Sequence, residues 1–228
     1  MPVLNESRVM SRLDQRVTET LSRLHRDAEA DKFVFARSIP AALGAKLRGR
    51  SVFQAVAPRL KDAYMPVTPQ MGEFLHITAL QLHAKTIVEF GSSFGISAIY
   101  LSSALPPGGR FIGSEMEPNK VSQARRNLES AGLADVAEIR PGDALETLAR
   151  PMDQPIDLLF LDGWKDLYVP ILKLLTPRLR SGSVVLADNI YTFRRELAEF
   201  VATVSNPDNG FASMTLPFKS GLQYSVRI

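Results

Sequence analysis

Two apolar runs that end abruptly in charged or amide side chains carry the residues best suited to chemistry. One run ends at Asp162, three residues before Lys165, and the other ends at Asp188-Asn189. Each run is typical of a buried strand in a parallel sheet, and open α/β sheets bind ligands at the carboxyl ends of their strands. If the strands are neighbours, Asp162, Asp188 and Asn189 offer three oxygen ligands of the type that Mg²⁺ or Ca²⁺ prefers. Lys165 would then lie beside them as a candidate base.

The same acidic residues have a simpler interpretation as helix caps. Aspartate after a strand is a common N-cap, so Asp162 could cap a helix that starts near Trp164. Asp188-Asn189 could do the same for a helix that starts near Tyr191. Taken singly, each residue favours the cap, whereas the glycine-rich loop described below favours the ligand site.

The elements that must position these residues alternate regularly from Lys85 onward. The expected strands are 86–90, 110–115, 136–140, 156–161 and 183–187, and the expected helices are 95–104, 118–131, 143–149, 164–175 and 191–204. Two strands without a helix between them, 211–216 and 223–228, close the chain. The pattern predicts an α/β fold with a Rossmann-like, doubly wound, mostly parallel seven-stranded sheet and an antiparallel C-terminal hairpin.

The N-terminal part of the chain is predicted to be helical. Residues 1–63 form an N-terminal helical extension, with one helix over 5–30 and shorter ones to about 60, and residues 64–228 form the main domain. Thr68-Pro69 is expected to cap a further helix that runs to His83. Because the apolar stripe of the extension must be buried, we expect a homodimer in which it covers part of a partner or roofs the active site.

Composition excludes several classes of protein. The chain has 228 residues, 45% hydrophobic and 22% charged, and no cysteine, which excludes disulfides, thiol nucleophiles and thiolate zinc sites. No apolar run reaches the length of a membrane span, and the start lacks the pattern of a signal peptide, so we expect a cytoplasmic protein without a membrane partner. The net charge is +3, and the basic residues of the extension are interspersed with acidic ones. That pattern is typical of a solvated helix face, and we expect no nucleic-acid partner.

A glycine-rich loop follows the first expected strand. Gly91 and Gly95 have the spacing G-x-x-x-G, which differs from the dinucleotide fingerprint G-x-G-x-x-G and suits a carboxylate-bearing ligand at the following helix. The second strand ends at Glu115, where an acidic residue can accept both hydroxyls of a ribose. Asp143-Ala144 follow the third strand, where the adenine would lie, although Asp143 could equally be an N-cap.

Several separate motifs carry a resemblance to a known family. They are Phe160-Leu-Asp162-Gly-Trp164-Lys165-Asp166-Leu-Tyr168-Val-Pro170, Leu186-Ala-Asp188-Asn189, Glu89-Phe-Gly91, Gly95-x-Ser97, and Glu115 with Pro118. In this order they resemble class I S-adenosylmethionine-dependent O-methyltransferases, and more narrowly the catechol and caffeoyl-CoA O-methyltransferase group. The resemblance covers roughly residues 64–228.

The resemblance implies a role for each matching residue. Methyl transfer from S-adenosylmethionine to a hydroxyl of a small catechol-like aromatic acceptor is the implied reaction, with Mg²⁺ (or Ca²⁺ or Mn²⁺) as the metal. For the cofactor, the resemblance implies that Glu89 binds the methionine amino group, that Ser93 and Ser97 with the Gly91–Gly95 loop bind its carboxylate, and that Glu115 binds the ribose. It also implies that Met116, Trp164, Asp143 and Ala144 lie beside the adenine and that Met65 lies near the reacting methyl group. For the reaction, it implies that Asp162, Asp188 and Asn189 bind the metal and that Lys165 is the base. Asp162 is expected to line the cofactor site as well.

Two departures from the family pattern leave the acceptor open. Gly163 stands where the family has a histidine beside the adenine, and the segment from Phe218 to Gln223 lacks the acidic residue common in related tails. Two alternatives also remain at this point. One is a nicotinamide-dependent oxidoreductase, which the absent G-x-G-x-x-G and the terminal hairpin disfavour. The other is a non-catalytic binding module on the same fold.

Overall fold

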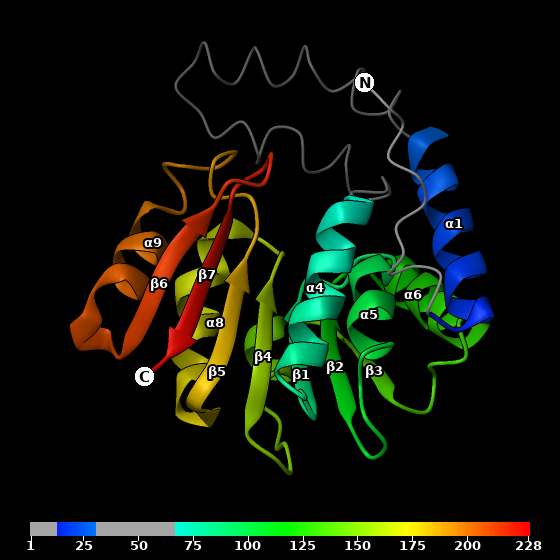
Figure 1. Ribbon diagram of the computed structural model, residues 1–228, viewed down its shortest axis with the longest axis horizontal. Helices are drawn as coiled ribbons and strands as arrows, with labels where there is room; N and C mark the ends of the chain where they lie inside the picture. The colour runs from blue at the N-terminus through cyan, green and yellow to red at the C-terminus, as the bar shows by residue number, and fades with distance from the viewer. Residues whose placement is uncertain (1–12, 31–66) are drawn as a thin grey trace.

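A seven-stranded sheet forms the centre of the molecule, with helices on both faces (Figure 1). The computed structural model describes residues 13–30 and 67–228. The strand order is β3-β2-β1-β4-β5-β7-β6, in which β7 runs antiparallel to β5 and β6. The strands are β1 Thr86–Phe90, β2 Arg110–Glu115, β3 Ala137–Pro141, β4 Ile156–Leu161, β5 Leu179–Ala187, β6 Phe211–Leu216 and β7 Leu222–Arg227. The predicted fold class is confirmed.

Helices divide between the two faces and bury one apolar cluster each. The first cluster joins one face of the sheet to α1 (Gln15–Ala30), α4 (Pro69–Gln81), α5 (Ile96–Ser102) and α6 (Pro118–Ser130). The second joins the other face to α7 (Ala144–Thr147), α8 (Tyr168–Leu175) and α9 (Ala198–Ser205). Within residues 13–30 and 67–228, short 3₁₀ turns complete these elements: η2 Lys165–Leu167, η3 Thr176–Arg178 and η4 Pro207–Asn209. None of the helices within residues 13–30 and 67–228 combines the length and apolar character that a bilayer span requires.

The parallel strands β1, β4 and β5 explain why the chemistry-bearing residues share one edge. Both β1 and β4 are buried along their whole length, as expected for strands covered by helices on two faces. Phe90 pairs with Leu161, and Leu161 pairs with Ala187, so the three strands end in step. The residues that follow them therefore emerge side by side on one rim.

The predicted element boundaries hold closely except at the start of β5, which begins at Leu179 and not at 183, and in the segment beyond β5. Thr68 caps α4 as expected, since its hydroxyl accepts a hydrogen bond from the Met71 N–H at 3.2 Å. The prediction of a helix over 191–204 is wrong in its first half, because α9 begins at Ala198 and residues 191–197 form turns. The N–H groups of Ile190 and Tyr191 donate to the Gly221 and Ser220 carbonyls, so the start of this segment is held against the β6–β7 turn.

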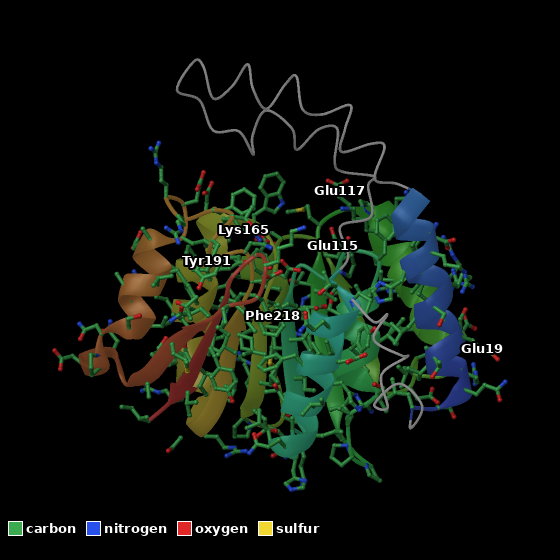
Figure 2. All side chains as sticks on the ribbon, turned by 45° about the horizontal axis from the view of Figure 1, so that its top comes forward. Glu19, Glu115, Glu117, Lys165, Tyr191 and Phe218 are labelled. Carbon is green, nitrogen blue, oxygen red and sulfur yellow. The ribbon has the colours of Figure 1, made fainter. Side chains whose placement is uncertain are left out.

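The α1 helix belongs to the same core as the sheet. Its buried apolar residues are Val17, Leu21, Leu24 and Ala28. Arg16 also donates to the Ser130 carbonyl at the end of α6, at 3.3 Å. Glu19 lies on this helix at the side of the molecule, away from the rim that carries Lys165 (Figure 2). The apolar stripe of α1 is thus covered by the same chain. The rest of the predicted extension, 1–12 and 31–63, lies outside the described residues.

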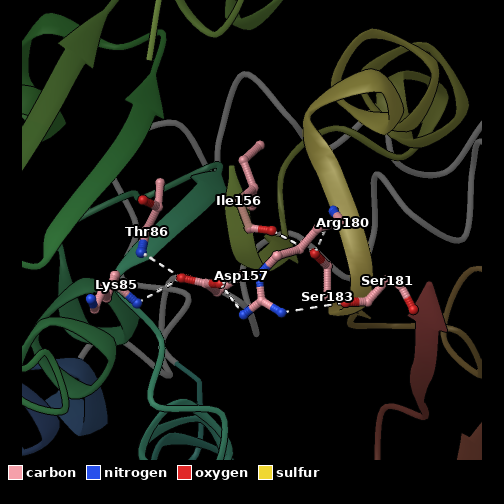
Figure 3. A network of polar contacts seen from close by, with 7 residues as sticks. All are labelled: Lys85, Thr86, Ile156, Asp157, Arg180, Ser181 and Ser183. Carbon is pink, nitrogen blue, oxygen red and sulfur yellow. Dashed lines mark hydrogen bonds and ion pairs between the residues drawn. The ribbon is translucent and has the colours of Figure 1, made fainter. Parts of the chain in front are cut away.

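A buried aspartate joins the central strands at their beginnings, the end opposite to the rim (Figure 3). Asp157 accepts hydrogen bonds from the Lys85 and Thr86 N–H groups at 2.7 and 3.0 Å. Its other oxygen accepts from the Arg180 guanidinium at 2.9 and 2.5 Å. The beginnings of β1, β4 and β5 are therefore joined through one carboxylate, which holds the three strands in the register that the rim needs.

Replacement of this carboxylate is expected to destabilise the fold. Asp157→Ala should lower the free energy of unfolding by about 2–4 kcal/mol, because two backbone N–H groups lose their acceptor. Arg180→Ala should cost about 1 kcal/mol or less, since the arginine side chain is 52% exposed and the backbone bonds remain. Urea unfolding of both variants measures the difference. Equal losses would show that the ion pair, and not the backbone bonds, supplies the stability.

Candidate functional site

The rim formed by β1, β4 and β5 brings Asp162 and Asp188 to neighbouring positions. The Asp162 N–H donates to the Phe90 carbonyl at 2.9 Å, and the Asp188 N–H donates to the Leu161 carbonyl at 3.1 Å. Each aspartate thus extends the ladder of hydrogen bonds by one residue past the end of its strand. Lys165 and Glu115 lie along this rim, with Tyr191 to one side (Figure 2).

Lys165 is a buried cation among carboxylates. Its Nζ lies 3.6 Å from Asp162 Oδ1 and donates to the Tyr168 hydroxyl at 2.9 Å. The Tyr168 hydroxyl donates in turn to the Asp188 carbonyl at 3.3 Å. Burial lowers the pKa of Lys165, while the charges of Asp162 and Asp188 oppose that change. This ammonium is therefore easier to deprotonate than an exposed one.

Neither aspartate acts as a helix cap. The N-cap position of the 3₁₀ turn after β4 is Trp164, and that of α9 is Leu197, and neither has a side-chain cap bond. Asp188 instead accepts from the Asn189 N–H at 2.6 Å and from Asn189 Nδ2 at 3.0 Å. Asn189 has a φ of 71°, a left-handed conformation that is uncommon outside glycine and that tends to occur at functional sites. The cap interpretation of Asp162 and Asp188 is therefore wrong.

The donor set of this rim fits a divalent cation. Within residues 13–30 and 67–228, no three His, Cys, Asp or Glu side chains are grouped so as to hold a metal ion. The candidate set has two carboxylates and an amide. The Nδ2 of Asn189 donates to Asp188, and its Oδ1 takes no hydrogen bond from the described residues. Burial raises the pKa of both aspartates, and Asp188 raises that of Asp162 further, so a cation would relieve a real electrostatic cost.

Glu89 is a second buried carboxylate, near the end of β1. The side chain is 0% exposed, and neither carboxylate oxygen has a hydrogen-bond partner among the described residues. Burial raises its pKa to about 7, and the nearby Ser92 and Ser97 hydroxyls, which do not reach hydrogen-bond geometry, offset only part of that rise. A buried, unpartnered carboxylate is costly unless a ligand supplies a donor or a positive charge. Glu89 is thus suited to a cationic ligand.

The loops after β1 and β4 touch at two glycines. Gly91 has a φ of 92°, and a Cβ there would lie 2.5 Å from the Gly163 Cα. A Cβ on Gly163 would lie 2.6 Å from the Phe90 ring. No side chain, histidine included, therefore fits at Gly163 without a shift of Phe90. The close Phe90 ring thus explains why this chain has a glycine at 163, where the resembling family has a histidine.

Glu115 links the ends of β1 and β2. Its two carboxylate oxygens accept hydrogen bonds from the Ser93 N–H at 2.8 Å and the Glu117 N–H at 2.9 Å. Ser93 has a φ of 47°, so the glutamate also fixes an unusual loop conformation. This carboxylate faces the rim between two loops, where a diol could reach it.

The other predicted cofactor residues surround the same edge of the sheet. Gly95 is the N-cap of α5, and Ser97 is buried in the first turn of that helix. Asp143 is the N-cap of α7 and accepts from the Leu145 N–H at 2.8 Å, and Ala144 follows it. Met116 and Trp164 are 52% and 44% exposed, which leaves apolar surface for a ring to cover. Met65 lies outside the described residues.

Sequence reasoning missed two residues at this rim. Tyr168 connects Lys165 to the Asp188 backbone, and its place three residues after Lys165 on a helical turn could have indicated this. Ser220 donates to Asp188 Oδ1 at 2.6 Å from the distant β6–β7 turn. No local pattern predicts that contact.

Comparison with known proteins identifies relatives of this chain. Residues 51–205 match the model of the O-methyltransferase family. Catechol O-methyltransferase of Mycobacterium tuberculosis is 33% identical over 165 residues, which are 71% of this chain and 75% of that protein. Catechol O-methyltransferase of Niastella koreensis is 34% identical over 142 residues, which are 60% of this chain and 64% of that protein. The match thus spans just under two thirds of the Niastella protein.

A solved structure supports the fold. The O-methyltransferase from Bacillus cereus in complex with SAH superimposes with a TM-score of 0.68 at 22% identity, over 86% of this chain and 91% of that one. The family model covers more than half of the chain, and the mycobacterial relative is matched over three quarters of its length. The chain belongs to the O-methyltransferase family.

Proposed function

We propose that this chain transfers a methyl group from S-adenosylmethionine to one hydroxyl of a catechol-like aromatic acceptor, with a divalent metal at Asp162, Asp188 and Asn189. The observation that carries the proposal is the buried Lys165 ammonium, 3.6 Å from Asp162 on a rim that also holds Asp188. A base beside an oxygen-ligand set is what methylation of a chelated diol requires. The similarity to catechol O-methyltransferases supports the same reaction.

The residues around β1 and β2 are suited to hold the cofactor. Glu89 offers a buried carboxylate to the methionine amino group, and this pairing would offset the cost of its burial. The backbone of the Gly91–Gly95 loop and the hydroxyls of Ser93 and Ser97 would hold its carboxylate. Glu115 offers two acceptor oxygens to the ribose. The exposed faces of Met116 and Trp164 would cover the adenine, near Asp143 and Ala144.

The residues around β4 and β5 are suited to activate the acceptor. A divalent cation, Mg²⁺ or alternatively Ca²⁺ or Mn²⁺, would lower the pKa of the hydroxyl to be methylated and fix its position. Lys165 would accept the hydroxyl proton at Nζ once its own proton is lost, and Tyr168 orients that nitrogen through the 2.9 Å hydrogen bond. Asp162 holds the lysine from the other side. Transfer from the sulfonium then depends mainly on the alignment of donor and acceptor.

The family match weakens the two alternatives unequally. A nicotinamide-dependent oxidoreductase has no support in the matched family or in the G-x-x-x-G loop. A non-catalytic binding module would keep the fold without the chemistry. The buried Lys165 argues against it, because burial of a lysine among carboxylates is costly and such perturbed groups cluster at catalytic sites.

Glu89→Gln is expected to stabilise the free protein and weaken cofactor binding. The pKa of Glu89 in the fold, about 7, lies above its ordinary value of 4.5, so its ionisation opposes folding increasingly as pH rises from 4.5 to about 7. The variant should therefore gain about 3 kcal/mol at pH 8 and almost nothing at pH 4.5. Urea unfolding at several pH values, with calorimetry of S-adenosylmethionine, measures both effects. A less stable variant at pH 8 would show that Glu89 already has a structural partner.

Glu115→Ala should weaken S-adenosylmethionine binding by about 1–3 kcal/mol, because two ribose hydroxyls lose a charged acceptor. Glu117→Ala is the matched control, since this neighbouring glutamate is exposed and its side chain makes no cap bond. Calorimetry of both variants gives the affinities. Unchanged binding in Glu115→Ala would show that the ribose site is elsewhere.

Metal removal should abolish turnover and leave the cofactor bound, because the metal is expected to contact the acceptor. EDTA should stop methylation of a catechol, and Asp162→Ala or Asp188→Ala should have the same effect. Asp166→Ala, an exposed acidic neighbour of the site, should retain activity. Full activity in EDTA would refute the metal mechanism.

Lys165→Ala should keep metal affinity but lose roughly 10²–10⁴-fold in the rate of the chemical step, the usual contribution of a general base. Single-turnover kinetics with saturating cofactor and acceptor isolate that step. A rate within a few-fold of the original chain would mean that another group takes the proton.

A further inference from the structure

The turn between β6 and β7 lies beside the end of β5, because β7 pairs with β5, and it contacts a carboxylate of the proposed metal site. Ser220 Oγ donates to Asp188 Oδ1 at 2.6 Å, although the two residues are 32 positions apart in the chain. Ser220 is only partly exposed, so this contact lies inside the rim and not on an open surface. The C-terminal hairpin therefore takes part in the structure of the site.

The turn is fixed against the segment that follows β5. The Tyr191 N–H donates to the Ser220 carbonyl at 2.8 Å, and the Ile190 N–H donates to the Gly221 carbonyl at 3.0 Å. Gly221 has a φ of 76°, and a Cβ there would lie 2.6 Å from the Tyr191 ring. Only glycine allows this close approach without strain. The Ser220 hydroxyl is thus presented to Asp188 by a backbone that has little freedom.

The hydrogen bonds of Asp188 come from two sources. Asn189 supplies two of them, its N–H to Oδ1 at 2.6 Å and its Nδ2 to Oδ2 at 3.0 Å. Both join neighbouring residues and fix the carboxylate only relative to its own segment. The bond from Ser220 is the one that comes from a different element among the described residues. Within residues 13–30 and 67–228, this hydrogen bond joins the Asp188 carboxylate to an element other than its own segment.

We infer that Ser220 is a positioning residue for the proposed metal site, and that it holds the Asp188 carboxylate in place from the C-terminal hairpin. The inference rests on the proposed function, since it assigns Asp188 to the metal. Outer partners of metal ligands orient the ligand, and their loss typically costs 10–100-fold in metal affinity. Removal of the Ser220 hydroxyl should therefore weaken the metal without any change to a ligand.

Binding of Mn²⁺, measured by calorimetry on the full chain, tests this inference. Ser220→Ala should bind Mn²⁺ at least about tenfold more weakly than the original chain. Ser220→Thr, which keeps a hydroxyl, should recover most of the affinity. Ser225→Ala is the matched control, because that buried serine lies in the same hairpin and its hydroxyl pairs with Ser213 at 2.9 Å. It should bind Mn²⁺ as the original chain does.

Each outcome bears on a different claim. Unchanged Mn²⁺ affinity in Ser220→Ala would overturn the inference, and so would an equal loss in Ser225→Ala, which would indicate general weakening of the hairpin. S-adenosylmethionine affinity should stay constant in all three variants, and its loss in Ser220→Ala would indicate a disturbed fold and also overturn the positioning role. An original chain that binds no Mn²⁺ would refute the proposed metal function itself, and this inference with it.

Discussion

The crowding of three carboxylates at the carboxyl ends of β1, β4 and β5, with the buried Lys165 ammonium among them, is the constraint on which the rest of the structure depends. Glu89, Asp162 and Asp188 are brought to one edge of the sheet, and Lys165 is the cation that shares their surroundings. Burial raises the pKa of all three carboxylates, which shows that the fold does not stabilise their ionised forms well. A site of this kind gains most from cationic ligands. An amino group at Glu89 and a divalent cation at the two aspartates would supply that charge.

The scaffold holds this charge in place from several directions. At the opposite end of the same strands, Asp157 joins the beginnings of β1, β4 and β5 and keeps them in register. The contact between Gly91 and Gly163 sets the distance between the loops that follow β1 and β4. The β6–β7 turn contacts Asp188 from β7, the strand that neighbours β5. Stability and function thus oppose each other locally, because the same groups that destabilise the free protein are the ones proposed to bind ligands.

The parts of the fold that sequence predicts well are those that local pattern determines. The bounds predicted for the strands 86–90 and 156–161 match the structure, because buried parallel strands are mostly apolar runs. Those of 110–115 match as well, although only its middle is apolar. The segment 191–197 was expected to be helical because its composition allows it. The hairpin that takes its first N–H groups is some thirty residues away, and no local pattern reveals it. The contacts of Tyr168 and Ser220 with Asp188 escaped prediction for the same reason, since both depend on tertiary packing. The roles of the individual site residues remain predictions.

The central claim is that an oxygen-ligand set on this rim activates a chelated diol. The most direct test is whether the enzyme prefers an acceptor with two adjacent hydroxyls to one with a single hydroxyl. The measurement compares kcat/KM for a catechol with that for the matching phenol, with S-adenosylmethionine and Mg²⁺ present and the methylated products identified by mass spectrometry. Chelation needs two adjacent oxygens, so the account predicts methylation of the catechol at one oxygen and a rate on the phenol lower by orders of magnitude. Comparable rates on the two acceptors would contradict it, because the metal ligands would then have no part in selecting or activating the hydroxyl.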